Sequence, residues 1–589
     1  MRRGYKNFYI RPSFIIKSLL QTKNILSIYI PAIFMVGYLV YIFLCFWYHP
    51  ATSDGLQYSY SLRGHYQHYL LLAKYSFRFC HFYIIRLFNL IISSPVEAAR
   101  LSSFFIHAGI VFLSYKIANK MAGWRAGTAV TILVIFFSPM LTFATQALTD
   151  PTMMLFAMIS FYLLIGLGGS SSWKLMIFFS GFSFMWCLFS KEIGVAFLPV
   201  FLYMVLEKGK WKGLLNFLAG AFAGLLIVSI FDWIYLKDFF FHLDPLKFFG
   251  SYLNLIINSE SAEIVRITTK DIFWALFGRD TLVFGFAWVF LFFAKSGLAR
   301  NKLIKIWLFG LSPLVLHMLM TTLKVGVISF PTRLYYIVIP FAIAMGCYFG
   351  ESAVEKKAAT LSIKNKTFFC ILLFFLLCVV VAISFGFRNI FNTTLSPQVI
   401  QGVRIFSPFL LMFAIGMFIL CRNKMFEINN RGDIKKSSFV FYCTFIIILA
   451  YHAFWGNAKA LENTSSLKRE LSKRTPLVQM LKKQKDFAYT WRIKNDHVYR
   501  LFAAYNLISN KQERDLHNPE YQKTPDEVFD PTGGILATNK KQILVTDYCL
   551  DKMTLLGQKY GFNPGQLFEF QEEYYGNVYF YRIEYNRDR

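Results

Sequence analysis

Two aspartates stand beside long apolar segments, where a carboxylate could take part in chemistry. Asp54 follows the first apolar segment in ATSDGLQY, and Asp150 precedes a later one in ALTDPTMM. A carboxylate held at a membrane surface can act as a general base on the head group of a lipid-tailed substrate. The alternative for Asp54 is a solvated loop residue, and for Asp150 a helix cap before Pro151. Because both aspartates fall on the same predicted membrane face, we expect them to serve one acceptor site.

Other charged residues also stand at the edges of apolar segments. Lys191 and Glu192 are adjacent in CLFSKEIGVAFLP, and such a pair forms either a solvated corner or the lining of a polar cavity. Arg333, in SFPTRLYYIVIPF, and Arg100, in EAARLSS, are candidate phosphate ligands, because a planar guanidinium fork matches two phosphate oxygens. The alternative for Arg333 is a side chain that extends to the membrane interface without binding a ligand.

Histidines and cysteines form no recognisable metal or redox motif. His81 and His242 could bind a metal from outer loops, but no ligand spacing supports a metal site, and packing at the interface is the preferred interpretation. His107 lies within an apolar segment and is expected to be a buried, hydrogen-bonded residue. The nine cysteines include no C-x-x-C pair, so neither zinc nor redox chemistry is indicated. The chain also lacks a glycine-rich phosphate loop and a G-x-S-x-G motif, so ATP-driven chemistry has no support.

The composition is that of a membrane protein. Of the 589 residues 56% are hydrophobic and 16% are charged, whereas soluble domains carry about 25% charged residues. The formal net charge of +29 would by itself also suit a nucleic-acid-binding protein. The Lys and Arg residues, however, stand in short runs between apolar segments, as topology signals do. We therefore expect no nucleic-acid partner.

The elements that must position the charged residues are predicted membrane helices, each of about 20 apolar residues. Loops rich in Lys and Arg alternate with Lys-poor loops such as TQALTDP, which places the N-terminus in the cytoplasm by the positive-inside rule. About thirteen spans fit the length requirement, and this odd number leaves the C-terminus outside. The expected spans are 25–47, 98–119, 127–144, 151–168, 173–190, 193–206, 213–235, 281–294, 303–322, 333–350, 367–387, 404–421 and 438–455.

The predicted fold class is a polytopic α-helical membrane protein with a small C-terminal α/β soluble domain. Residues 1–455 form the transmembrane domain, and its long outer loops, 48–97 and 236–280, carry aromatic stretches suited to interfacial helices. After Trp455 the composition becomes charged, and KKQILVTDYCL and YYGNVYFYRIEY predict strands around a helix in DKMTLLGQKYGF. Residues 456–589 are long enough for an extracytoplasmic domain of this kind.

Several segments, taken in order, resemble the integral-membrane C-type glycosyltransferases, in the bacterial branch of protein O-mannosyltransferase-like and aminoarabinose transferase-like enzymes. The resemblance covers most of residues 25–350. It rests on ATSDGLQY, SPVEAARLSSFFIHAGIVFLSYKIANKMAG, FFSPMLTFATQALTDPTMMLF, SKEIGVAFLPVFLYMVL and TRLYYIVIPF. Two departures concern the first loop, where Gly55 replaces the family's usual second acidic residue and His81 alone matches its histidine–proline pair.

The resemblance implies a glycosyltransferase that takes a sugar from a polyprenyl-phosphate carrier at the outer leaflet and transfers it with inversion. Asp54 would deprotonate the acceptor, while Asp150 would orient the acceptor or assist the base. Three cations would hold the leaving phosphate: Arg333, Lys191 and Arg100. Three further residues are expected to contact substrate: Glu192, His81 and Tyr58.

The implied partners are the lipid-linked sugar donor, membrane lipid, and a glycolipid, glycan or protein acceptor. No motif requires a cofactor, and a divalent metal stays open. The expected location is the bacterial inner membrane, with a cytoplasmic N-terminus and an extracytoplasmic C-terminus. Two alternatives are a transporter or flippase of lipid-linked sugars and an O-antigen polymerase or ligase. The first predicts paired halves with broken helices and the second a large polar loop late in the chain, and neither pattern is found in the sequence.

Overall fold

The computed structural model describes most fully the helical part of the chain. The described residues are 29, 31–47, 78–166, 172–241, 304–316 without 307 and 314, 335–354, 448–464 without 462, and the strand residues 488–489, 542–546, 562–572 and 576–585. Three predicted spans, 281–294, 367–387 and 404–421, lie outside these residues. The number of thirteen spans therefore stays a prediction.

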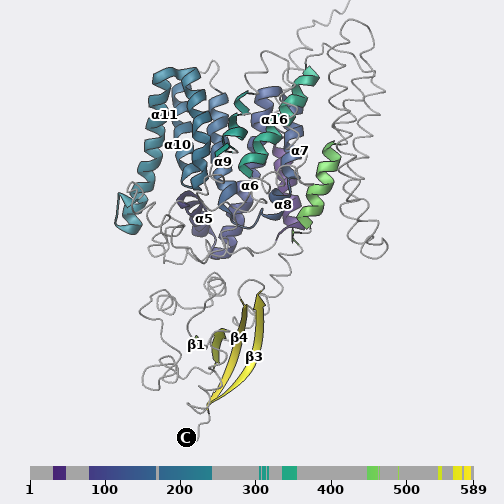
Figure 1. The fold of residues 1–589 in the computed structure, drawn as a ribbon, viewed down its shortest axis with the longest axis vertical. Helices are drawn as coiled ribbons and strands as arrows, with labels where there is room; N and C mark the ends of the chain where they lie inside the picture. The colour runs from purple at the N-terminus through teal and green to yellow at the C-terminus, as the bar shows by residue number, and fades with distance from the viewer. Residues whose placement is uncertain are drawn as a thin grey trace, which may run out of the picture.

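The described helices pack side by side in a bundle (Figure 1). In chain order they are α5 (Phe79–Ile91), α6 (Pro95–Ala122), α7 (Trp124–Ile135), α8 (Ser138–Thr142), α9 (Thr149–Ile165), α10 (Trp173–Leu188), the 3₁₀ helix η1 (Glu192–Phe197), α11 (Leu198–Leu236) and α16 (Tyr335–Val354). Helices at Pro31–Cys45 and over 448–461 join the same bundle. Helices therefore lie where the spans 98–119, 151–168, 173–190 and 333–350 were predicted.

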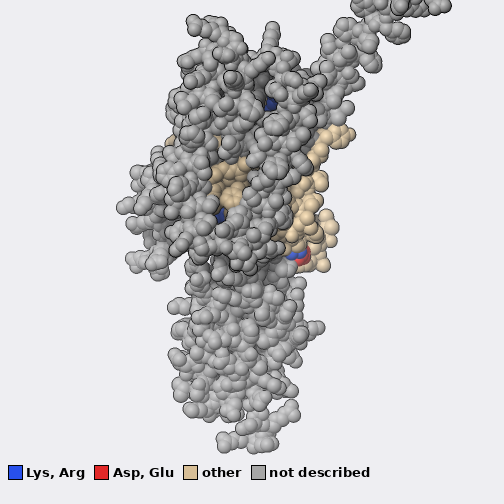
Figure 2. Space-filling view, turned by 90° about the vertical axis from the view of Figure 1, so that its right-hand side faces the viewer, with Lys and Arg blue, Asp and Glu red and all other residues tan. Residues whose placement is uncertain are grey.

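The surface of the described bundle is largely apolar. Among the described residues, Pro95–Ala122 and the helical stretch Ile193–Ile234, which folds back at Lys210, are long and apolar enough to cross a membrane, and the other apolar helices are shorter. Large apolar side chains such as Phe43 on the first helix and Phe222 on α11 are exposed. On the face drawn in Figure 2, the described surface shows few charged atoms. A surface of this kind is suited to contact with lipid chains.

Helix α6 begins three residues before the predicted span 98–119 because of its N-terminal sequence, SPVE. The Ser94 hydroxyl accepts a hydrogen bond from the Glu97 N–H at 3.4 Å, and Pro95 occupies the first helical turn, where no N–H is needed. The helix ends before Gly123, whose φ of 84° suits glycine.

Helix α11 reverses direction at Lys210, as the predicted corner between spans 193–206 and 213–235 requires. Lys210 has non-helical angles, φ 47° and ψ −143°. A Cβ on Gly213 would stand 3.0 Å from the Val205 carbonyl oxygen, whereas eight residues of straight helix extend about 12 Å. The two halves of α11 therefore fold back on each other.

The predicted span 127–144 is in fact broken into α7 and α8. Pro139 has no N–H to donate, and the Phe137 N–H bonds to the Val134 carbonyl at 3.2 Å instead of continuing the helical pattern to Leu133. Side chains of four other helices bond to carbonyl groups of this break: Tyr38 to Met140, Ser103 to Phe143, Tyr335 to Pro139 and His452 to Leu133. The break is thus held inside the protein, and the TQALTDP stretch, expected as an outer loop, begins with buried Thr145 and Gln146.

The C-terminal part contains a four-stranded sheet in the order β1-β2-β4-β3. Its strands are β1 (Ala488–Tyr489), β2 (Gln542–Thr546), β3 (Phe562–Glu572) and β4 (Gly576–Tyr585), and only β1 and β2 pair in parallel. Strands β2 and β4 lie where strands were predicted, whereas β3 was not expected. The predicted helix of this part lies outside the described residues, so the α/β class stays a prediction. In Figure 1 the sheet lies beyond the end of the bundle that holds α5.

Close packing of α10 on the second half of α11 leads to a first prediction. A Cβ on Gly220 would stand 1.8 Å from the Phe178 carbonyl oxygen, so the Gly220→Ala substitution must push the two backbones apart. We expect it to lower the free energy of unfolding by about 1–3 kcal/mol, measured as a lower melting temperature of the protein purified in detergent.

The matched control is Gly37→Ala, because a Cβ on Gly37 would meet no atom within 4 Å. There the alanine is expected to be neutral or to stabilise the helix by about 0.5–1 kcal/mol. Equal losses in the two variants would contradict the packing argument.

Candidate functional site

The structure brings together two of the predicted site residues, Asp150 and Lys191. Lys191 Nζ lies 2.6 Å from Asp150 Oδ1, and the two side chains are 8% and 1% exposed. A buried pair of this kind compensates its own charge but loses the hydration of both ions. The Lys191 side chain is therefore not solvated. This excludes the solvated corner, one of the two interpretations of its position in the sequence.

The packing of α9 against α10 explains why residues 41 positions apart meet. The Ser160 and Ser180 hydroxyls lie 2.6 Å apart, and the Ser183 hydroxyl donates to the Phe156 carbonyl at 2.9 Å. Each step toward the start of α9 is thus matched by a step toward the end of α10. This antiparallel register, continued to the helix ends, sets Asp150 opposite Lys191.

Asp150 does not cap α9. The N-cap position is Leu148, and Asp150 lies in the first turn of the helix with its carboxylate turned to Lys191. A carboxylate in the first turn is still favoured by the positive end of the helix dipole. The capping alternative is therefore replaced by an ion pair.

His81 of α5 bonds to the chain on both sides of Asp150. Its Nε2 lies 3.1 Å from the Ala147 carbonyl oxygen, and its Nδ1 lies 2.7 Å from Thr152 Oγ1. A carbonyl can only accept, so Nε2 carries a proton, and in the neutral ring Nδ1 accepts from the Thr152 hydroxyl. The imidazole is completely buried. Within the part of the chain that the structure describes, no group of three or more His, Cys, Asp or Glu residues could hold a metal ion.

Helix α5 also contacts the Lys191 side of the pair. The Cys80 N–H donates to the Phe189 carbonyl at 3.1 Å, two residues before Lys191. Burial raises the pKa of the Cys80 thiol well above its usual range, with the Cys187 thiol acting in the same direction, so Cys80 is a packing residue and not a nucleophile. The apolar residues Leu90 and Ile91 at the other end of α5 are exposed, as expected for an interfacial helix.

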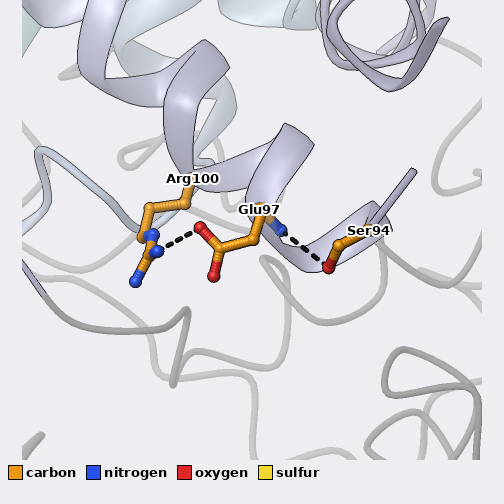
Figure 3. A network of polar contacts seen from close by, with 3 residues as sticks. All are labelled: Ser94, Glu97 and Arg100. Carbon is orange, nitrogen blue, oxygen red and sulfur yellow. Dashed lines mark hydrogen bonds and ion pairs between the residues drawn. The ribbon is translucent and has the colours of Figure 1, made fainter. Parts of the chain in front are cut away.

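Arg100 lies in a second cluster at the start of α6, shown in Figure 3. Its guanidinium forms an ion pair with Glu97, whose N–H is bonded to Ser94. The same guanidinium stands 4.2 Å from the centre of the Trp47 ring, at the end of the first helix. Arg100 therefore joins that helix to α6, and its predicted role as a phosphate ligand stays a prediction.

The remaining predicted residues are less fully described. Asp54, Tyr58 and Arg333 lie outside the described residues, and Glu192 is described only as the first residue of η1. Sequence reasoning missed Asp232, a completely buried carboxylate near the end of α11. The available signal was an acidic residue inside a long apolar helix, which is costly in a membrane and often functional.

Residues 79–234, the part of the chain that holds the ion pair and His81, match the family described as dolichyl-phosphate-mannose-protein mannosyltransferase. The crystal structure of ArnT from Cupriavidus metallidurans bound to undecaprenyl phosphate has the same fold, with a TM-score of 0.50 at 11% identity over 94% of this chain and 97% of that one. The family match and the fold both point to similarity with the integral-membrane C-type glycosyltransferases. This confirms the resemblance predicted from the sequence.

Two other solved structures were also matched. ArnT from Cupriavidus metallidurans in the apo state has a TM-score of 0.43 at 13% identity, over 85% of this chain and 87% of that one. The archaeal oligosaccharyltransferase AglB from Archaeoglobus fulgidus, in complex with an inhibitory peptide and a dolichol-phosphate, has a TM-score of 0.36 at 12% identity, over 94% and 74%. The comparison with curated proteins gave no match.

A second prediction follows from the burial of the ion pair. Asp150→Asn leaves the Lys191 ammonium buried without its carboxylate, which should lower the free energy of unfolding by about 3–5 kcal/mol. The double variant Asp150→Asn/Lys191→Met removes both charges and should regain much of this loss, measured as melting temperature in detergent.

The control is Glu207→Gln at the more exposed pair of Lys305 and Glu207, 2.5 Å apart, where the expected loss is about 0–1 kcal/mol. A loss for Asp150→Asn no larger than for Glu207→Gln would show that the pair is not a buried one.

Proposed function

We propose that this protein transfers a sugar from a polyprenyl-phosphate donor to an acceptor at the outer face of the membrane, with inversion at the anomeric carbon. The observation that carries the proposal is the buried pair of Asp150 and Lys191 at one end of the bundle, within the segment that matches the mannosyltransferase family. Support also comes from the ArnT structure of the same fold, which has undecaprenyl phosphate bound.

Lys191 is the cation best placed in the described residues to act on a leaving phosphate. Departure of the sugar leaves negative charge on the phosphate oxygen, and a cation already fixed in a water-poor site stabilises that charge without reorganising. Asp150, at 2.6 Å, holds the ammonium in position and balances its charge before the donor arrives. Arg333 and Arg100 are proposed as further phosphate ligands, and Glu192 and Tyr58 as substrate contacts.

Asp54 is proposed as the general base. The carboxylate takes the proton from the acceptor hydroxyl or amine as the acceptor atom bonds to the anomeric carbon, and the bond from that carbon to the phosphate oxygen breaks on the opposite side. The chain length limits how far Asp54 can lie from the start of α6, because Asp54 follows Trp47 by seven residues, which reach at most about 25 Å when extended. Trp47 itself stacks on Arg100 at the start of α6.

The arrangement of the bundle ends supports an outer-face site. Helix α5, which contacts both sides of the ion pair, lies at the end of the bundle nearest the C-terminal sheet in Figure 1. The charge pattern of the loops supports that end as the outer one. A donor of this class brings its phosphate to the interface and its tail into the bilayer, so the site requires no nucleotide pocket. We propose the bacterial inner membrane as the location, with a cytoplasmic N-terminus and an extracytoplasmic C-terminus.

The base assignment predicts that Asp54→Asn keeps the fold and loses transfer. General-base catalysis contributes about 10²–10⁴-fold to rate, and asparagine retains the shape of aspartate without its basicity. The measurement uses protein purified in detergent, a radiolabelled polyprenyl-phosphate sugar and an envelope extract as acceptor source, with loss of label from the donor followed over time.

Asp433→Asn, on a predicted inner loop, serves as the control and should transfer at the wild-type rate. Normal transfer by Asp54→Asn would overturn the assignment of the base.

The phosphate-ligand assignment predicts that Arg333→Ala weakens donor binding. Loss of a charged hydrogen bond is worth about 1.5–3 kcal/mol, so the Kd for undecaprenyl phosphate should rise at least about tenfold. Arg300→Ala, on a predicted inner loop, should bind as the wild type does. An unchanged Kd in Arg333→Ala would remove this arginine from the site.

A further inference from the structure

We propose that His81 is a positioning residue that fixes Asp150, and through it Lys191, and that it does not itself contact substrate. This deepens the proposed function and rests on it for the role of Lys191. The sequence suggested His81 as a substrate contact, but the structure surrounds its ring with protein groups. The inference depends on the two ring nitrogens and on the protein groups to which each is hydrogen-bonded.

The two partners of His81 lie on either side of Asp150. Ala147 comes three residues before it and Thr152 two residues after it, and the ring reaches them at 3.1 Å and 2.7 Å. Ala147 has a φ of 50°, a left-handed conformation that disfavours alanine and persists only where the surroundings hold it. The bond from His81 Nε2 to the Ala147 carbonyl is one such constraint. His81 thereby fixes the path by which the chain enters α9.

A direct contact of His81 with substrate would disrupt this arrangement. The imidazole is 0% exposed, and its protonated nitrogen already donates to a carbonyl that can only accept. A ligand could bond to the ring only after one of the two protein bonds was broken. The ring acts on the site through the chain that it holds.

Helix α5 links both sides of the ion pair through consecutive residues. His81 bonds beside Asp150, and the Cys80 N–H bonds to Phe189, beside Lys191. Two consecutive residues of α5 thus hold the chain beside both members of the pair, and His81 does so through its side chain.

The test is a double-mutant cycle on transfer. His81→Leu keeps an apolar side chain but removes both bonds, and we expect kcat to fall about 100-fold, as misplacement of a catalytic group does, with a smaller change in donor KM. His81→Gln retains a donor and an acceptor and should recover most of the loss. In an Asp150→Asn background, His81→Leu should cause little further loss, because the group that it positions is already gone.

Thr152→Val removes one of the two bonds and should lower kcat by a smaller factor. Its matched control is Thr131→Val, since the Thr131 hydroxyl is also buried but bonds only to the Gly127 carbonyl within α7. This control should keep the wild-type kcat. Independent, multiplicative losses for His81→Leu and Asp150→Asn would overturn the inference.

A readout without activity separates this inference from the proposed function. If the wild-type protein neither transfers a sugar nor binds undecaprenyl phosphate, the proposed function fails. The double-mutant cycle of His81→Leu and Asp150→Asn is then measured by the melting temperatures of the variants in detergent. Non-additive losses for His81→Leu and Asp150→Asn support the positioning role, and additive losses overturn it.

Discussion

The structure depends on one constraint: inside a membrane, each backbone polar group must find its partner within the protein. The break between α7 and α9 is demanding in this respect, because Pro139 has no N–H for the Ile135 carbonyl and the Phe137 N–H bonds to Val134 instead of Leu133. Side chains from four separate helices bond to carbonyl groups of this break. His452 donates to the Leu133 carbonyl at 2.8 Å, and Tyr335 adds a bond at 2.7 Å to the Pro139 carbonyl, which also accepts the Phe143 N–H. Helices far apart in the sequence are therefore held together by bonds to one irregular segment.

This irregular segment also delivers the charged site. Because the chain between Ile135 and Thr149 is interrupted on both sides of the short helix α8, α9 can start beside α5 and opposite the end of α10. A buried ion pair gains little net stability, since the lost hydration of both ions offsets much of their attraction. The pair of Asp150 and Lys191 is thus better explained by charge needed at this place than by its contribution to folding. Apolar packing among α5, α9, α10 and α11 offsets the lost hydration of the two ions.

Local patterns predicted much of the helical fold, because length, apolar content and loop charge are readable along the chain. Local signals also explain the differences in α6 and α8, since Ser94 and Pro139 were present in the sequence. The ion pair was not predictable in the same way. Asp150 and Lys191 were both identified, but in separate roles, because their contact depends on the register between α9 and α10. The two bonds of His81 likewise depend on tertiary packing, and the predictions for Asp54, Tyr58 and Arg333 stay predictions.

Helix α5 shows how a short segment can belong to two environments at once. Its first turn places Cys80 and His81 against the chain on either side of the ion pair, while Leu90 and Ile91 at its far end are exposed. An apolar end of this kind is stable against lipid, and a buried polar end is stable only where its bonds are complete. Rotation of α5 about its own axis would expose the imidazole to lipid and break both of its bonds. The orientation of the helix is therefore determined by its polar end.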